Sequence, residues 1–123
     1  MMYRRLSAAF LACAIVCAGI SAAHAHAFLD TADPAVGATL KLAPTAVTII
    51  FSEALEPRFS SVSAENEAGQ RVDLGDAHTA PDDARRLSVG LKPLKPGGYK
   101  VLWRATSIDT HKTTGHYNFT VAP

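Results

Sequence analysis

Alternation of apolar and polar residues runs through several short segments of this chain, and beyond residue 26 no segment shows the apolar stripe of an amphipathic helix. In AVTIIFS, Val47, Ile49 and Phe51 fall on one face of an extended chain. The same period recurs in three other segments: RLSVGL (86–91), YKVLWRAT (99–106) and HYNFTV (116–121). Because successive side chains of a strand point to opposite faces, each pattern predicts a strand with one face in a core.

Turn-forming residues separate the predicted strands, at Asp33-Pro34, 67–70 and 95–98. Two further short strands are expected at 60–65 and 70–74, and the polar, acidic stretch 75–86 is expected to form a loop. Several short strands joined by turns predict one all-β domain. We expect a small antiparallel β-sandwich with Greek-key connections, with a barrel as the alternative.

The first 25 residues have the composition of a cleaved export signal. The first five residues carry two arginines and no acid, and the uncharged run Leu6–Ile20 is shorter than the roughly 20 residues that span a bilayer. Ala23 and Ala25 fit the A-x-A pattern of cleavage sites. We expect general export, rather than the twin-arginine route, and cleavage after Ala25. His26 would then begin a mature domain of residues 26–123.

Removal of the leader changes the composition of the protein. Both cysteines and both methionines lie in the leader, so the mature domain contains no sulfur and must rely on its core alone. Two of the twelve basic residues also leave, so ten face eleven acidic residues. This balance argues against binding to nucleic acid, which requires a basic surface.

A histidine at the amino terminus can bind one metal ion through two nitrogen atoms, those of its α-amine and its imidazole. These groups have pKa values of about 8 and about 6.5, so both can lose a proton near neutral pH. The segment SIDTHKTTGHYNF adds Asp109 and His111, whose spacing puts them on one side of an extended chain. We therefore predict a metal site of His26, Asp109 and His111. For Asp109 and His111, the alternative is a solvated Asp–His contact in a loop.

The predicted ligands favour one metal. Two imidazoles, an amine and a carboxylate suit Cu(II), with Ni(II) and Zn(II) behind it. Cu(I) prefers thiolate and thioether sulfur, which the mature domain lacks, and a blue-copper centre requires cysteine. The other two mature histidines, His78 and His116, are expected at the surface, with His116 the better placed to supply an extra ligand.

Three segments carry a family resemblance: HAFLDTADPAVGATL (26–40), PTAVTIIFSEAL (44–55) and GGYKVLWRATSIDTHKTTGHYNFTV (97–121). They resemble the periplasmic copper-binding proteins of the copper-resistance protein C (CopC-like) family, over nearly the whole mature chain. The resemblance implies a cupredoxin-like or immunoglobulin-like Greek-key sandwich in the periplasm. It also implies a histidine brace for Cu(II), in which His26 supplies amine and imidazole, His111 the second imidazole and Asp109 a carboxylate.

Two positions near these ligands are informative in the same comparison. Glu53, in FSEAL, matches a family acid near the copper site, so we expect it beside the metal or as a weak ligand; an ordinary exposed carboxylate is the alternative. Thr110 stands where the family often has glycine, and Lys112 replaces a frequent proline. If the backbone at Thr110 needs a positive φ, its side chain constrains the loop.

The resemblance implies a carrier or buffer of Cu(II) for copper resistance, not an enzyme, that works with an inner-membrane copper-resistance protein D (CopD-like) importer. We expect a monomer. The main alternative is a histidine-brace copper oxidase or monooxygenase on a related sandwich. Against it, Tyr99, Trp103 and Tyr117 alternate with core positions instead of forming a flat face for glycan. A metal-free adhesin or pilus-type sandwich is the third hypothesis.

Overall fold

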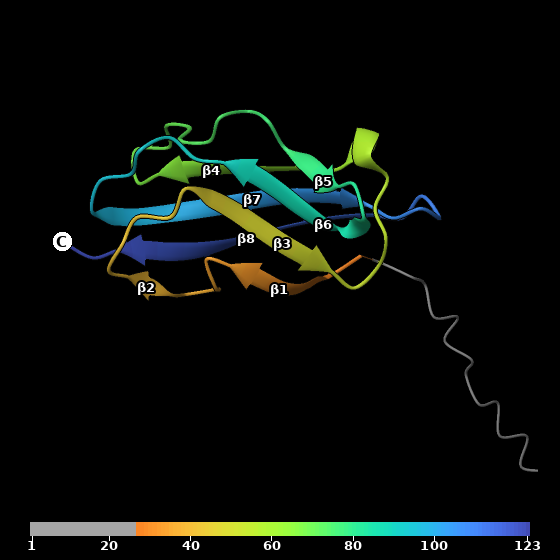
Figure 1. The fold of residues 1–123 in the computed structure, drawn as a ribbon, viewed down its shortest axis with the longest axis horizontal. Helices are drawn as coiled ribbons and strands as arrows, with labels where there is room; N and C mark the ends of the chain where they lie inside the picture. The colour runs from red at the N-terminus through yellow and green to blue at the C-terminus, as the bar shows by residue number, and fades with distance from the viewer. Residues whose placement is uncertain (1–26) are drawn as a thin grey trace, which may run out of the picture.

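A computed structural model of the protein describes residues 27–123, which form two four-stranded sheets around one core (Figure 1). The strands are β1 (Leu29–Asp33), β2 (Thr39–Leu40), β3 (Ala46–Phe51), β4 (Ser61–Asn66), β5 (His78–Ala80), β6 (Asp83–Gly90), β7 (Gly97–Thr106) and β8 (Lys112–Val121). A short 3-10 turn, η1 (Pro57–Phe59), precedes β4. One sheet has the order β1-β3-β6-β5 and the other β2-β8-β7-β4. All pairs are antiparallel except β2 with β8, so the predicted all-β sandwich is confirmed.

The core lies between the two sheets and contains the apolar faces predicted from the alternation. The buried apolar residues of the four predicted strands are Val47, Ile49, Phe51, Leu87, Val89, Leu91, Tyr99, Val101, Ala105, Tyr117, Phe119 and Val121. Strands β7 and β8 form the longest ladder, which runs from Gly97 opposite Val121 to Thr106 opposite Lys112. Within residues 27–123, no helix is long and apolar enough to cross a membrane.

Trp103 packs across the sheet onto a glycine. The indole meets the Phe51 ring edge-on, with 5.2 Å between the ring centroids. Directly opposite on β8 lies Gly115, where a Cβ atom would come within 2.3 Å of Trp103 Cζ2. The indole therefore occupies the space that a side chain on Gly115 would need.

Three sequence expectations need correction. The stretch 75–86 is not a continuous loop, because it contains β5 and the start of β6. The expected strand at 70–74 is reduced to single bridges, from Arg71 to Glu65 and from Asp73 to Leu91. Strands β1 and β2 were not expected. Both β1 and β5 are mainly polar strands at the edges of their sheet, where one side has no neighbouring strand to bury it, so they lack the apolar alternation.

A buried carboxylate fixes the segment that follows β4. Asp73 accepts hydrogen bonds from the backbone N–H groups of Ala64 and Gly75, both at 3.0 Å. The Arg71 guanidinium completes the set, with Nη2 2.7 Å from Asp73 Oδ2. Burial acts to raise the pKa of Asp73, but these donors outweigh it and the pKa is lowered. Asp73 thus joins two stretches of backbone as an ionised acceptor.

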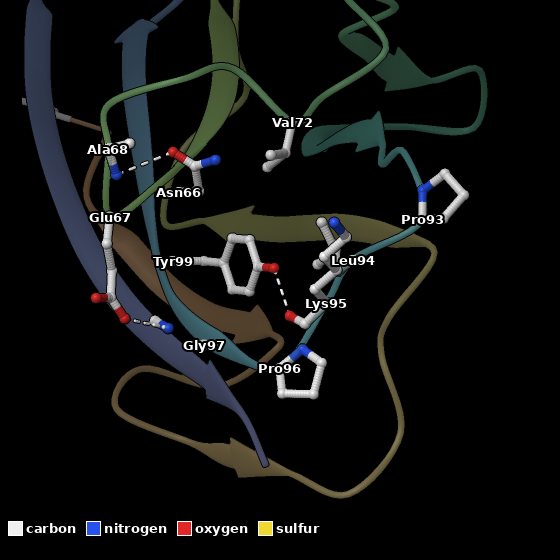
Figure 2. Close-up of a pocket in the computed structure, with 11 residues that line it drawn as sticks. Asn66, Glu67, Ala68, Val72, Pro93, Leu94, Lys95, Pro96, Gly97 and Tyr99 are labelled. Carbon is white, nitrogen blue, oxygen red and sulfur yellow. Dashed lines mark hydrogen bonds between the residues drawn. The ribbon is translucent and has the colours of Figure 1, made fainter. Parts of the chain in front are cut away.

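A pocket of about 430 Å³ lies at the end of the sandwich where β7 begins, between the segments 66–72 and 93–99 (Figure 2). The Glu67 carboxylate accepts a hydrogen bond of 2.7 Å from Gly98 N–H. The Tyr99 hydroxyl donates to the Lys95 carbonyl. The first bond joins the two segments at one end of β7, and the second lies within the segment 93–99. Asp109 and His111 lie past the other end of β7.

Candidate metal-binding site

The β7–β8 connection, residues 107–111, is a compact turn built on Ser107. The Ser107 N–H donates to the His111 carbonyl at 3.0 Å, and the Thr110 N–H donates to the Ser107 carbonyl at 2.8 Å. The Ser107 side chain is buried beneath the turn, and its Oγ accepts a hydrogen bond of 3.3 Å from His111 N–H. This network fixes the backbone that carries the predicted ligands.

Asp109 and His111 come together as expected, but in a turn and not in the extended chain from which the expectation was argued. Asp109 Oδ2 lies 3.4 Å from His111 Nδ1, and the two side chains are 50% and 38% exposed. The Ser107 hydroxyl donates to Asp109 Oδ1. That hydrogen bond, reinforced by the nearby His111, lowers the pKa of Asp109. The turn therefore presents a carboxylate and an imidazole side by side at an accessible surface.

Thr110, between the two, has φ +71°, and it is the one non-glycine residue with positive φ among residues 27–123. A β-branched side chain is strained in this left-handed region, where glycine is not. The backbone at Thr110 thus has the positive φ considered from the sequence, and the Thr110 side chain constrains the loop.

Replacing Thr110 with glycine is expected to stabilise the fold by about 1 kcal/mol, because the strain relieved exceeds the entropy that glycine adds to the unfolded chain. Urea denaturation measures the change. The matched control is Ile108→Gly, in the same turn but without positive φ, which should destabilise the protein. A destabilised Thr110→Gly variant would show that the Thr110 side chain makes a net favourable contribution.

The first described residues are fixed at the same end of the molecule as this turn (Figure 1). Ala27 is fully buried, and its carbonyl accepts a hydrogen bond of 2.6 Å from Thr113 Oγ1. Phe28 and Ser52 exchange two bonds: Phe28 N–H donates to Ser52 Oγ at 3.0 Å, and Ser52 N–H donates to the Phe28 carbonyl at 2.8 Å. His26 lies outside the described residues, but its neighbour is tied to the strand that follows His111.

Glu53 lies beside the turn. It shares the lining of a small hollow of about 170 Å³ with Ala54, Ser107, Ile108 and Asp109. The Glu53 side chain is exposed. The structure therefore brings two carboxylates, from the end of β3 and from the β7–β8 connection, to the same hollow.

The other histidines lie elsewhere. His78 is in β5, at the edge of the opposite sheet, with its Nδ1 2.8 Å from the Asp76 carbonyl oxygen. His116 is exposed on β8, four residues or roughly 13 Å along the strand from Lys112. No three His, Cys, Asp or Glu side chains gather as a metal site within residues 27–123.

Sequence reasoning missed the supporting hydroxyls. Ser107, Ser52 and Thr113 fix the turn and the start of the described chain. A serine two residues before an aspartate is a local signal for a hydrogen-bonded turn, so the sequence contains an indication of the role of Ser107. Ser52 and Thr113 bond to residues distant in the sequence and carry no such signal.

Known proteins resemble the chain over nearly all of the described residues. The CopC domain matches residues 29–122. Protein YobA of Escherichia coli strain K12 is 40% identical over 98 residues, which are 79% of each chain. Copper resistance protein C of Escherichia coli is 32% identical over 123 residues, covering 94% of this chain and 97% of that protein.

The chain is also similar to part of a longer protein and to a solved structure. Copper transport protein CutJ of Bacillus subtilis is 33% identical over 98 residues, which are 79% of this chain and only 18% of that protein. The crystal structure of CopC from Methylosinus trichosporium OB3b superposes with a TM-score of 0.75 and 34% identity, covering 80% of this chain and 95% of that one. The sandwich is thus shared with a solved CopC structure.

Proposed function

The chain belongs to the CopC domain family, and on that premise we propose that it binds Cu(II) through His26, Asp109 and His111 and carries or buffers copper in the periplasm. It is a copper-binding protein of a resistance family and not an enzyme. Copper is here the cargo. The oxidation state, the ligand set and the location are the parts that we propose.

One observation carries the ligand set: the hydrogen bond of 2.6 Å from Thr113 Oγ1 to the Ala27 carbonyl. Thr113 follows His111 by two residues, so Ala27 is fixed next to the strand that leaves the candidate site. The Cα atom of His26 is only about 3.8 Å from that of Ala27. Cleavage after Ala25 would free the His26 amine at this place.

The donor atoms of the proposed site suit Cu(II). They are three nitrogens and a carboxylate oxygen, a set that Cu(II) binds in tetragonal geometry. Like any aspartate with an ordinary or lowered pKa, Asp109 is ionised at neutral pH, so it needs no proton loss to bind. The neighbouring Glu53 adds a second negative charge to the surroundings of the ion. Residues 26–123 contain no cysteine or methionine, so they offer no sulfur ligand for Cu(I).

The accessibility of the site supports a carrier. Asp109 and His111 are 50% and 38% exposed, so an ion held there can pass directly to another protein. A copper transport protein contains a segment similar to this chain within a much longer polypeptide. This supports a transporter as the partner, and we propose a CopD-like inner-membrane importer. The leader-like first 25 residues support the periplasm as the location.

Changing Thr113 to valine tests the proposal at the observation that carries it. Wild-type protein beginning at His26 should bind one Cu(II) ion. The Thr113→Val variant should bind it about five- to tenfold more weakly, because a lost hydrogen bond of about 1 kcal/mol no longer fixes the first residues. Competition with a chromophoric Cu(II) chelator measures both constants.

The matched control is Thr114→Val, one residue further along β8 with its side chain on the exposed face, which should leave the affinity unchanged. Absence of one-to-one Cu(II) binding by the wild-type protein would contradict the proposed function. Equal affinity of wild type and Thr113→Val would contradict the role of the Ala27 anchor alone.

A further inference from the structure

Three basic side chains surround a hollow on the outer face of sheet β2-β8-β7-β4, next to the proposed copper site. Arg58, Arg104 and Lys112 line this basic hollow, whose volume is about 520 Å³, together with Phe59, Ser61 and Thr114 among others. No aspartate or glutamate lines it. The hollow therefore combines positive charge, hydroxyl groups and one aromatic ring.

Strand pairing explains why these side chains converge. Arg104 on β7 lies opposite Ser61 on β4 and Thr114 on β8. Lys112 pairs with Thr106 two residues further along the same ladder. Arg58 comes from η1, which is tied to β7 by a 3.0 Å hydrogen bond from the Thr106 hydroxyl to the carbonyl of the adjacent residue, Phe59. The basic groups thus reach one face from three segments of the chain.

None of the three cations is neutralised within the described part of the chain. The arginines that do form ion pairs there are Arg71, with Asp73, and Arg85, with Asp30. Like charges gathered around one opening repel each other and create a positive potential that attracts anions. This concentration contrasts with the near balance of charge in residues 26–123.

We propose that the basic hollow docks an acidic segment of the protein that exchanges copper with this chain. The inference rests on the proposed function, since it places the docking surface beside the ion: Lys112 directly follows His111, and Thr106 directly precedes Ser107. Phe59, 60% exposed at the hollow, offers an apolar contact to the same segment. A protein segment fits better than an anionic membrane, because a flat bilayer cannot enter a concave surface.

A hexaglutamate peptide titrated into isotopically labelled protein beginning at His26 tests the docking surface. Amide resonances of residues 58–61, 104–106 and 112–114 should shift, and the dissociation constant should rise with added sodium chloride because the contacts are exposed charges. The double variant Arg58→Gln/Arg104→Gln should bind at least about fivefold more weakly, the loss of two exposed charge contacts. Hexalysine should not bind.

The control Arg86→Gln/Lys92→Gln removes the same net charge from two exposed positions, one within β6 and one after its end, and should bind hexaglutamate like the wild type. Equal weakening by both double variants, shifts outside the hollow, or binding only to phosphatidylglycerol vesicles would overturn the inference. Cu(II) titration of the wild-type protein separates the two proposals. A wild-type protein that binds Cu(II) but not hexaglutamate defeats the docking surface only, and a wild-type protein that does not bind Cu(II) defeats the proposed function.

Discussion

Replacing His111 with alanine is expected to weaken Cu(II) binding by at least about 100-fold. Losing a mere hydrogen-bond partner of a metal ligand costs 10- to 100-fold in affinity, and here one of two imidazole ligands itself is removed. His111 is 38% exposed, so the substitution leaves no large cavity and the fold should persist. Chelator competition gives the affinity, and circular dichroism confirms the folded state.

The matched control for this variant is His78→Ala. His78 lies in the opposite sheet, in β5, and its loss should change the copper affinity less than twofold. Electron paramagnetic resonance adds a second readout, because nitrogen coupling to Cu(II) should decrease in His111→Ala and remain in His78→Ala. Affinities of His111→Ala and wild type within a factor of two would remove His111 from the site.

Replacing Asp73 with alanine is expected to reduce the free energy of unfolding by about 2–4 kcal/mol at pH 7. The variant leaves the buried Ala64 N–H and the partly buried Gly75 N–H without their acceptor, and each such loss costs about 1–3 kcal/mol. Urea denaturation measures the difference. The control Asp82→Ala, an exposed acid in the turn between β5 and β6, should change stability by less than about 0.5 kcal/mol.

The stabilisation of the fold by Asp73 is also expected to depend on pH. Folding lowers the pKa of Asp73, so its stabilising contribution is fully present above the unfolded pKa of about 3.9. The contribution is lost as the pH falls through the lower folded pKa. The stability gap between wild type and Asp73→Ala should therefore shrink in strong acid. A gap that stays constant from pH 7 to pH 2 would contradict the role of the ionised carboxylate.

The sequence predicts the core well because burial imposes a period of two on a strand. Val47, Ile49 and Phe51 alternate with less buried residues in the sequence, and all three are fully buried. The edge strands were missed for the complementary reason. In β5, His78–Ala80, no side chain is fully buried, so hydrogen bonding to β6 determines the strand and hydrophobicity leaves no pattern.

In the candidate site, a local contact could be predicted from the sequence and a distant one could not. Asp109 and His111 meet because they are two residues apart in one turn, a relation visible in the sequence. The anchoring of Ala27 by Thr113 joins residues 86 positions apart, and only the fold brings them together. The role of His26 was inferred from chemistry and stays a prediction.

The most direct test of the account compares Cu(II) affinity in two proteins, one beginning at His26 and one with a single alanine added before it. The extension converts the His26 amine into an amide and leaves residues 27–123 unchanged. We predict that the extended protein binds Cu(II) at least about 100-fold more weakly, because loss of a ligand atom should cost at least as much as the 10- to 100-fold that follows from loss of a hydrogen-bond partner of a ligand. Equal affinity in the two proteins would contradict the amino-terminal histidine site.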